Sequence, residues 1–431
     1  MRGALPSLVA ALLLVCAACS ASPDFTDAER ALLRDFAIGA PPSDPTNAVA
    51  DSPAAAALGQ KFFFDTRFSG PLAIGSNGSN GATGPAGASG TVGCVSCHDP
   101  SQGGTDVRSR PGNTSLGSSW TGRNAPTVYN AAYSPWQFWD GRRDSLWSQA
   151  LGPVESAIEH NFSRLQVAHL IVQLYSGPYA QVFGPLPDLS DSGRFPAAGK
   201  PGDPSWDQML PADQAEVDRV FSNFGKAIEA YERQLLDRDS AFDRYMTGDT
   251  AALSPAAVRG AKLFVGRASC NECHSGPTFS DGRFHNTGVA QVGATVPLVD
   301  VGRLNGLPQV LSVEFNSAGL YSDSANSSLL QAAAAEAAAN PEANRGAFKT
   351  SGLRGVAKTA PYMHTGAFPT LRDVVVFYRD GGGASGFAGT KDIAMQPLLL
   401  SDRDVDDLVA FLESLSGAPL PASLVTSPVL P

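Results

Sequence analysis

The arrangement of the six cysteines constrains the fold of this 431-residue chain more than any other feature. They occur only as three pairs with two residues between the partners, at positions 16 and 19, 94 and 97, and 270 and 273. A histidine directly follows each of the last two pairs. Disulfide frameworks scatter their cysteines along the chain, so this pattern argues against a disulfide scaffold. The chain is instead predicted to fold around two local Cys-x-x-Cys-His motifs.

Both motifs are typical of covalent haem c attachment, in which two thiols form thioethers with the porphyrin and the next histidine ligates the iron. A redox dithiol or half of a zinc site is the alternative, but zinc would need two further ligands near each pair and the sequence has none there. Two copies, each after a helical pattern, favour haem. We predict two haem c groups, the first held by Cys94, Cys97 and the proximal ligand His98, the second by Cys270, Cys273 and His274.

The first residues are predicted to direct export. Arg2 followed by an apolar run over 8–18 is typical of a signal peptide covering residues 1–18, and the run is too short to be a stable membrane span. The next residue, Cys19, stands in an Ala-Ala-Cys-Ser sequence that resembles a bacterial lipobox. We predict a periplasmic protein tethered to a membrane surface by lipid on Cys19. Ordinary cleavage near Ala21, which would release a soluble product, is the alternative.

Length and hydrophobic periodicity predict a mainly α-helical protein with two domains. The net charge of −10 makes nucleic acid a poor partner. Apolar residues recur near every third or fourth position over 212–236, a second helix is expected over 159–175, and the best candidate strand is 298–301. The predicted division is a lipid-anchored segment 19–43, an N-terminal haem domain 44–210, a C-terminal haem domain 211–418 and a tail 419–431.

Several short motifs occur in one order along the chain, at 58–65, 123–127, 137–142, 149–153 and 360–366. Through these motifs the sequence resembles the bacterial diheme cytochrome c peroxidase/MauG family over about residues 58–417. The resemblance implies two cytochrome c-like helical domains with one covalent haem c each, and haems that face each other across the domain interface. It also implies that the N-terminal haem reacts with hydrogen peroxide.

The resemblance implies an open distal side at the N-terminal haem. Peroxidases of the family that need prior reduction carry a displaceable histidine in the segment matching 115–120, where this chain has Ser118. No histidine lies between positions 98 and 160. The family's acid–base carboxylate falls on Glu159, where it can move a proton between the two peroxide oxygens. Glu155 is the nearby alternative carboxylate.

Three further positions around this haem match family positions. Gln149 and Pro153 correspond to other residues of the distal pocket. Trp139 corresponds to the tryptophan that lies between the two haems, where an aromatic ring lets an oxidising equivalent be shared. A buried core tryptophan with a satisfied indole N–H is the alternative interpretation, and the two are compatible.

The C-terminal haem carries the most informative departure from the peroxidases. They place an axial methionine fourteen residues after the histidine that corresponds to His364, and this chain has Tyr378 there. MauG-type enzymes use tyrosine at this position as the axial ligand. A phenolate stabilises oxidised iron, whereas a thioether favours the ferrous state. The chain is therefore predicted to be closer to the MauG-type enzymes, with His274 and Tyr378 on the second iron and Met395 as the alternative ligand.

The resemblance also implies a calcium site between the domains. Its family ligands are an asparagine side chain and two backbone carbonyls, which fall on Asn124, Thr359 and Pro361. His364 is expected in a structural or haem-propionate contact and not on iron. The other histidines have no assigned role: His160 would line the pocket or lie at the surface, while surface or core positions are the default for His169 and His285.

The implied function is that of a MauG-type diheme oxidase that uses hydrogen peroxide. The expected high-valent state is shared by both haems and oxidises an external substrate, such as a tyrosine or tryptophan of a partner protein. The runner-up is a cytochrome c peroxidase that receives electrons from a small cytochrome or cupredoxin, and the third alternative is a non-catalytic electron-transfer cytochrome. Insertions at 75–90, 185–204 and 331–339 either shape a partner surface or are neutral.

Overall fold

The computed structural model describes residues 25–431, so the predicted signal peptide and Cys19 lie outside the described residues. The described chain is mainly helical, as predicted. Its two short strands, β1 (Phe284–His285) and β2 (Phe348–Lys349), form one antiparallel pair in which Phe284 faces Lys349 and His285 faces Phe348. Within residues 25–431, no helix combines the length and the apolar character that crossing a membrane requires.

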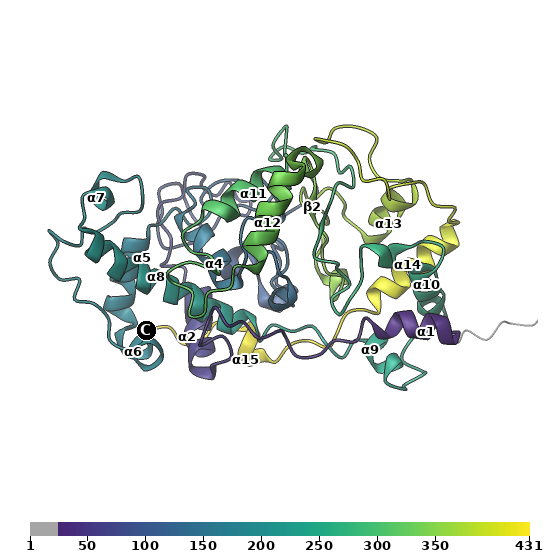
Figure 1. Cartoon of the computed structure of the whole chain (residues 1–431), viewed down its shortest axis with the longest axis horizontal. Coiled ribbons are helices and arrows are strands. Elements are labelled where there is room, and N and C mark those ends of the chain that lie inside the picture. Colours follow the sequence, from purple (N-terminus) through teal and green to yellow (C-terminus); the bar gives the residue numbers. More distant parts are fainter. Residues whose placement is uncertain (1–24) are drawn as a thin grey trace, which may run out of the picture.

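The helices gather into two lobes that lie side by side along the long axis (Figure 1). The first lobe contains α2 (Pro53–Phe64), α3 (Cys94–Cys97), α4 (Leu146–Glu155), α5 (Arg164–Leu174), α6 (Ser176–Phe183), α7 (Pro204–Asp207) and α8 (Pro211–Glu232). The second contains α1 (Asp27–Arg34), α9 (Ala241–Met246), α10 (Pro255–Val265), α13 (Leu371–Arg379) and α14 (Asp402–Glu413). Between them lie α11 (Arg303–Ser312) and α12 (Ser328–Ala339), and α15 (Ala422–Val425) follows near the end of the chain. Short 3₁₀ turns complete the described structure at Pro100–Gln102, Ala131–Tyr133, Cys270–Glu272, Pro341–Asn344 and Val356–Lys358.

The core of the first lobe forms around α8, which packs against α2, α4 and α5. Its apolar stripe meets buried aromatic rings of these helices, as in the pair of Phe62 and Phe224 with ring centroids 4.9 Å apart. Gly59 allows α2 to approach closely, because a Cβ there would come within 1.8 Å of the Ala227 carbonyl oxygen. This packing puts α8 in the first lobe, so the N-terminal domain continues past the predicted boundary at 210/211.

The second lobe is built on α10 and α14, which cross at Gly260, where a Cβ would come within 1.9 Å of the Asp407 carbonyl oxygen. Phenylalanine rings fill its centre, with Phe264 and Phe411 at 5.2 Å between centroids. The N-terminal α1 packs against α10. The described chain therefore begins in the second lobe, although the next helix, α2, belongs to the first.

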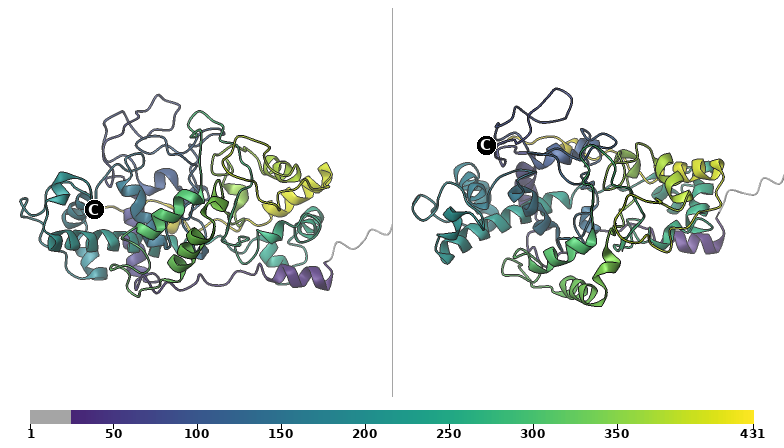
Figure 2. Two further views of the ribbon diagram at one scale, coloured as in Figure 1. Left: turned by 45° about the horizontal axis from the view of Figure 1, so that its top comes forward. Right: turned by 90° about the horizontal axis from the view of Figure 1, so that it is seen from above.

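Among the segments that join the lobes, two long ones lie along the lower edge in Figure 1. The N-terminal strap, residues 35–52, runs from α1 to α2, and Figure 2 shows it in purple on the outside of the molecule. Arg233 at the end of α8 holds it through an ion pair with Asp51 (2.8 Å) and a hydrogen bond to the Pro42 carbonyl (2.9 Å). The chain after α14 returns to the first lobe, where Gln60 donates to the Ser423 carbonyl (2.7 Å).

Two local predictions were wrong. The helix expected over 159–175 begins only at Arg164, because Ser163 caps it and Asn161 has a positive φ of 51° that interrupts helical geometry. The candidate strand 298–301 does not form. Leu298 is 92% exposed, so the apolar run that suggested a buried strand lies at the surface, and the nearest pairing is a single bridge between Gly302 and Ala347.

Candidate functional site

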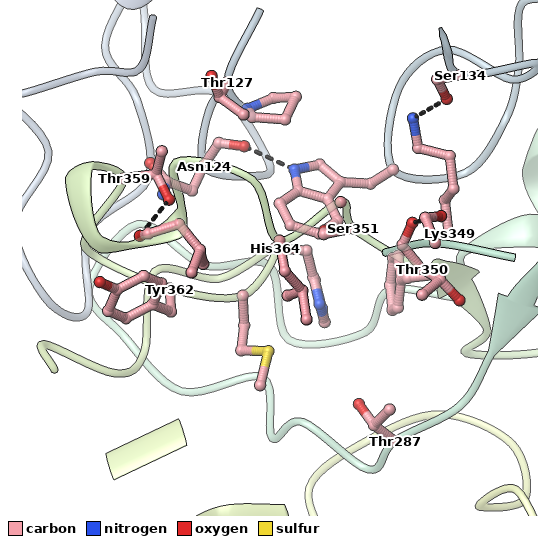
Figure 3. Close-up of a pocket in the computed structure, with 18 of the residues that line it drawn as sticks. Asn124, Thr127, Ser134, Thr287, Lys349, Thr350, Ser351, Thr359, Tyr362 and His364 are labelled. Atoms are coloured by element: carbon pink, nitrogen blue, oxygen red, sulfur yellow. Dashed lines mark hydrogen bonds between the residues drawn. The ribbon is translucent and has the colours of Figure 1, made fainter. Parts of the chain in front are cut away.

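A cavity of about 850 Å³ lies between the lobes and reaches both Cys-x-x-Cys-His motifs. Figure 3 shows part of its wall, to which Asn124, Lys349 and His364 contribute from distant parts of the chain. Every residue proposed from the sequence for peroxide chemistry, electron sharing, iron ligation in the second lobe or calcium binding lines this one cavity: Asn124, Trp139, Gln149, Pro153, Glu159, His274, Thr359, Pro361 and Tyr378.

The four motif cysteines are free thiols with no disulfide among them. Burial raises the pKa of Cys97 and of Cys270 to about 12 and raises that of Cys94 as well. Zinc ligands and reactive dithiols depend on thiolates, which this environment disfavours. Thioether formation leaves an uncharged sulfur, so the buried setting fits covalent haem attachment.

The two motif histidines are neutral and positioned for metal ligation. Burial lowers the pKa of both rings. In His274, Nδ1 donates a hydrogen bond to the Phe279 carbonyl (2.9 Å), which leaves Nε2 as the free donor atom for iron. In His98, the buried Nδ1 has no hydrogen-bond partner within the described residues. Together with the buried thiols and the cavity, these rings fit two haem c groups.

The wall of the cavity near the first motif contains the three predicted distal residues. Gln149 and Pro153 lie on α4, and Glu159 follows in the turn before α5. The alternative carboxylate, Glu155, does not line the cavity and instead forms an ion pair with Arg164 at 2.8 Å. The structure therefore separates the two glutamates: one reaches the cavity and the other holds α4 to α5.

Ser118 stands where some peroxidases of the family carry a displaceable histidine. Its side chain forms hydrogen bonds outside the cavity. Its hydroxyl donates to the Pro71 carbonyl (3.1 Å) and accepts from the Ala73 amide (3.1 Å). Its backbone amide donates to the Glu159 carbonyl (2.7 Å), which holds the segment against the turn that carries Glu159. Ser118 does not line the cavity.

Trp139 is half-buried, so it is not the buried core residue of the alternative interpretation, and its place between the haems stays a prediction. Its indole N–H donates to the Asn124 carbonyl oxygen (2.8 Å), the bond drawn as a dashed line from Asn124 in Figure 3. Its ring also lines the cavity and meets the His364 ring edge to face, with centroids 6.2 Å apart. A satisfied polar group and a cavity-lining aromatic face occur in the same side chain.

Asn124, Thr359 and Pro361 come together where the lobes meet. The Asn124 side-chain amide donates to the Pro361 carbonyl oxygen (2.9 Å), and its own Oδ1 is buried without a hydrogen-bond partner within the described residues. An unpartnered buried carbonyl oxygen is costly unless a cation or water satisfies it. Amide oxygens and backbone carbonyls are the donors that calcium prefers, so this set fits the predicted ion.

Tyr378 lies on α13 and lines the cavity beside the second motif. Burial raises the pKa of its phenol, so the phenolate needs a nearby cation. No described residue forms a hydrogen bond with its hydroxyl. Met395 lines the same cavity, so the alternative ligand remains within the site and must be tested directly.

The remaining histidines have defined places. His364 stacks on Phe348 with centroids 3.7 Å apart, and burial lowers its pKa to about 3, so the ring is neutral. His160 is a core residue bonded to the Phe68 carbonyl, so neither the pocket nor the surface position expected for it is correct. His169 contacts the Pro196 carbonyl oxygen (3.0 Å), and His285 lies between two carboxylates, Asp281 (3.0 Å) and Asp392 (2.7 Å).

Sequence reasoning missed two buried ionisable groups in this cavity. Lys349 donates to the Ser134 hydroxyl and the Trp136 carbonyl (both 2.8 Å), and within residues 25–431 it has no carboxylate partner. Burial lowers its pKa to about 8. Burial likewise raises the pKa of Glu232, at the end of α8, to about 8. Neither residue belongs to the quoted motifs, and only the packing of distant segments reveals them.

Comparison with known proteins identifies the family. Residues 53–251 match the family described as di-haem cytochrome c peroxidase. The cytochrome-c peroxidase IdrP2 of Pseudomonas sp. (strain SCT) is 32% identical over 86% of this chain and 84% of its own length. The chain belongs to the di-haem cytochrome c peroxidase/MauG family. The methylamine utilization protein MauG of Methylorubrum extorquens is 28% identical, with 88% of this chain and 82% of that protein covered.

The solved structures agree with this assignment. A MauG-like protein associated with microbial copper homeostasis has a TM-score of 0.58 and 25% identity, with 91% of this chain and 95% of that chain covered. The family membership makes the protein a haem-dependent oxidoreductase of the peroxidase/MauG type that uses hydrogen peroxide and has two haem c cofactors. It also implies a redox partner or a substrate protein.

Proposed function

We propose that this protein is a MauG-type oxidase, which withdraws two electrons with hydrogen peroxide and passes the oxidising equivalents to a partner protein. The observation that carries the proposal is the single cavity that contains Glu159 near one motif and Tyr378 near the other, with Trp139 in the same wall. Ser118, engaged outside the cavity, supports an open distal side at the first motif. The predicted lipid anchor on Cys19 would hold the reaction at a membrane surface facing the periplasm.

When bound, haem supplies the iron at which the peroxide O–O bond breaks and from which electrons are withdrawn. Glu159 accepts a proton from one peroxide oxygen and returns it to the other, so that the departing oxygen leaves as water. The Gln149 amide orients the bound peroxide, and Pro153 closes the wall without contributing a competing backbone N–H. Each turnover consumes one peroxide, two protons and two electrons and produces two waters.

In the second lobe, Tyr378 supplies a hard anionic oxygen that stabilises the oxidised form of the metal. The ring of Trp139 lies in the wall shared by both motifs, where it can share an electron hole between the two halves of the cavity. The final substrate is proposed to be an oxidisable aromatic residue of the partner, such as tyrosine or tryptophan. One structural relative is a MauG-like protein associated with microbial copper homeostasis, and this association concerns that protein alone.

The first prediction concerns the resting protein. We expect the ferric holoprotein to contain one high-spin and one low-spin haem, because a sixth ligand, Tyr378, is proposed only for the second iron. One equivalent of peroxide without a donor should then oxidise the protein by two electrons, which a reductant titration recovers. Electron paramagnetic resonance and absorption spectroscopy measure both points. Two low-spin haems, or loss of the two equivalents within the mixing time, would contradict the proposal.

A second candidate function is that of a cytochrome c peroxidase with a small cytochrome or cupredoxin as electron donor. Its specific support is Met395, which lines the cavity and offers a thioether of the kind that favours ferrous iron. This function requires rapid turnover with a reduced donor and a second haem of high potential. Steady-state peroxide consumption with and without a reduced donor separates it from the oxidase proposal. A purely electron-transferring cytochrome would consume no peroxide in either case.

A second prediction concerns the calcium site. We expect elemental analysis of the buffer-exchanged holoprotein to find one Ca²⁺ per chain. Asn124→Ala should lose this Ca²⁺, because the substitution removes the unpartnered Oδ1 and keeps the backbone carbonyl that accepts from Trp139. Asn286→Ala is the matched control, because that buried amide serves only backbone groups of the second lobe. Equal calcium in Asn124→Ala and the wild type would remove Asn124 from the ligand set.

A further inference from the structure

The N-terminal strap begins in the centre of the second lobe. Phe36, two residues after α1, is 2% exposed and stacks on Phe279 with ring centroids 4.3 Å apart and an interplanar angle of 4°. The rings of Phe242 and Phe264 pack edge-on against this pair. The Phe36 ring therefore forms one side of the aromatic packing around the Phe279 ring.

Phe279 contacts the iron-binding machinery through its backbone. Its carbonyl oxygen accepts the hydrogen bond from Nδ1 of His274 (2.9 Å). The residue is fully buried and has a positive φ of 58°, which is costly for a phenylalanine and persists only when the surroundings hold it. The stacked ring therefore determines where this carbonyl points, and the carbonyl in turn orients the imidazole.

Arg354 fastens the strap to the same loop. Its guanidinium donates to the Phe36 carbonyl (2.7 Å) and to the Pro277 carbonyl (2.6 Å), and it pairs with Asp243 (2.9 Å). The arginine side chain is 1% exposed, so these bonds form away from competing water. One buried side chain joins the strap, the loop before Phe279 and α9.

We infer that the N-terminal strap positions the proximal histidine of the second haem, with Phe36 and Arg354 acting through Phe279 on His274. A carbonyl that accepts from Nδ1 strengthens the imidazole as a donor and stabilises ferric iron. Loosening that carbonyl raises the reduction potential of this haem. Arg233 holds the other end of the strap on the first lobe. The same segment therefore contacts the first lobe at one end and the surroundings of His274 at the other.

The test is Phe36→Ala in the full-length holoprotein, with both haem potentials measured by spectroelectrochemical titration. Leu33→Ala is the matched control, because Leu33 is buried in the same core but has no aromatic ring that could stack on Phe279. We expect Phe36→Ala to raise the ferrous-to-ferric ratio of one haem about tenfold at a fixed applied potential, which corresponds to about 59 mV for a one-electron couple. The ferrous-to-ferric ratio of the other haem should stay within twofold of the wild-type value. The same should hold for both haems of Leu33→Ala.

Arg354→Lys provides an independent arm that does not depend on the folding of Phe36→Ala. A lysine keeps the charge opposite Asp243 but replaces the planar fork, whose three nitrogens each serve a different partner, with one compact ammonium, so it should shift the same haem in the same direction. Equal potentials in the wild type and these variants, or an equal shift in Leu33→Ala, would overturn the inference. The inference requires only that His274 ligates iron, so it survives if Tyr378 or the oxidase activity proves wrong.

Discussion

Glu159→Gln is expected to slow the reaction of the holoprotein with hydrogen peroxide by about 10²–10⁴-fold, the usual contribution of a positioned acid–base group. Glutamine has the size and polarity of glutamate but cannot carry a proton from one peroxide oxygen to the other. Haem content and both reduction potentials should remain those of the wild type, because Glu159 lies in a turn of the cavity wall and its side chain bonds to no other element among residues 25–431. Stopped-flow absorption at varied peroxide concentration measures the rate.

The control is Glu155→Gln, the same chemical change four residues earlier. That carboxylate pairs with Arg164 outside the cavity, so its peroxide rate should match the wild type in the folded fraction. A third variant makes the result decisive. Glu232 also lines the cavity, and burial raises its pKa to about 8, so this carboxyl can exchange protons near neutral pH, as can the Lys349 ammonium, whose pKa burial lowers to about 8. If Glu232→Gln loses the rate and Glu159→Gln keeps it, the acid–base role belongs to Glu232.

The helices could be predicted where an apolar stripe is long and is buried on one side. The pattern over 212–236 became α8. Prediction failed where a local interruption outweighs hydrophobicity: Asn161, with its positive φ, delays the start of the helix expected over 159–175 to Arg164. The predicted domain boundary at 210/211 was also misplaced, because α8, which follows it, packs back onto the first lobe.

The sequence was sufficient to predict which residues line the candidate site, but not which of them contact one another. The family motifs named the residues that line the cavity, because motif order survives the insertions between them. No pattern in the sequence indicates that Lys349 lies without a carboxylate partner or that Phe36 stacks on Phe279. Such contacts join segments far apart in the chain, and they depend on how two lobes and a strap close together in space.

Tyr378→Met is expected to raise the reduction potential of the second haem by a few hundred millivolts, within the span of about 0.8 V that axial ligands produce. The phenolate oxygen favours the oxidised metal and the thioether sulfur the reduced metal, so the sign follows from exchanging one donor for the other. Burial raises the pKa of the Tyr378 phenol, so an anionic form in this wall would need a compensating cation such as the metal. The variant should also lose the two oxidising equivalents within seconds.

Met395→Leu decides whether this interpretation is correct, because Met395 is the other side chain in the cavity proposed as a ligand. If Tyr378 is the ligand, Met395→Leu leaves both potentials unchanged and Tyr378→Met moves one of them. If Met395 is the ligand, the leucine variant loses the low-spin signal of the second haem, and Tyr378→Met has little effect. The first outcome supports an oxidase that stores equivalents for a partner, whereas the second supports a peroxidase that draws electrons from a small donor.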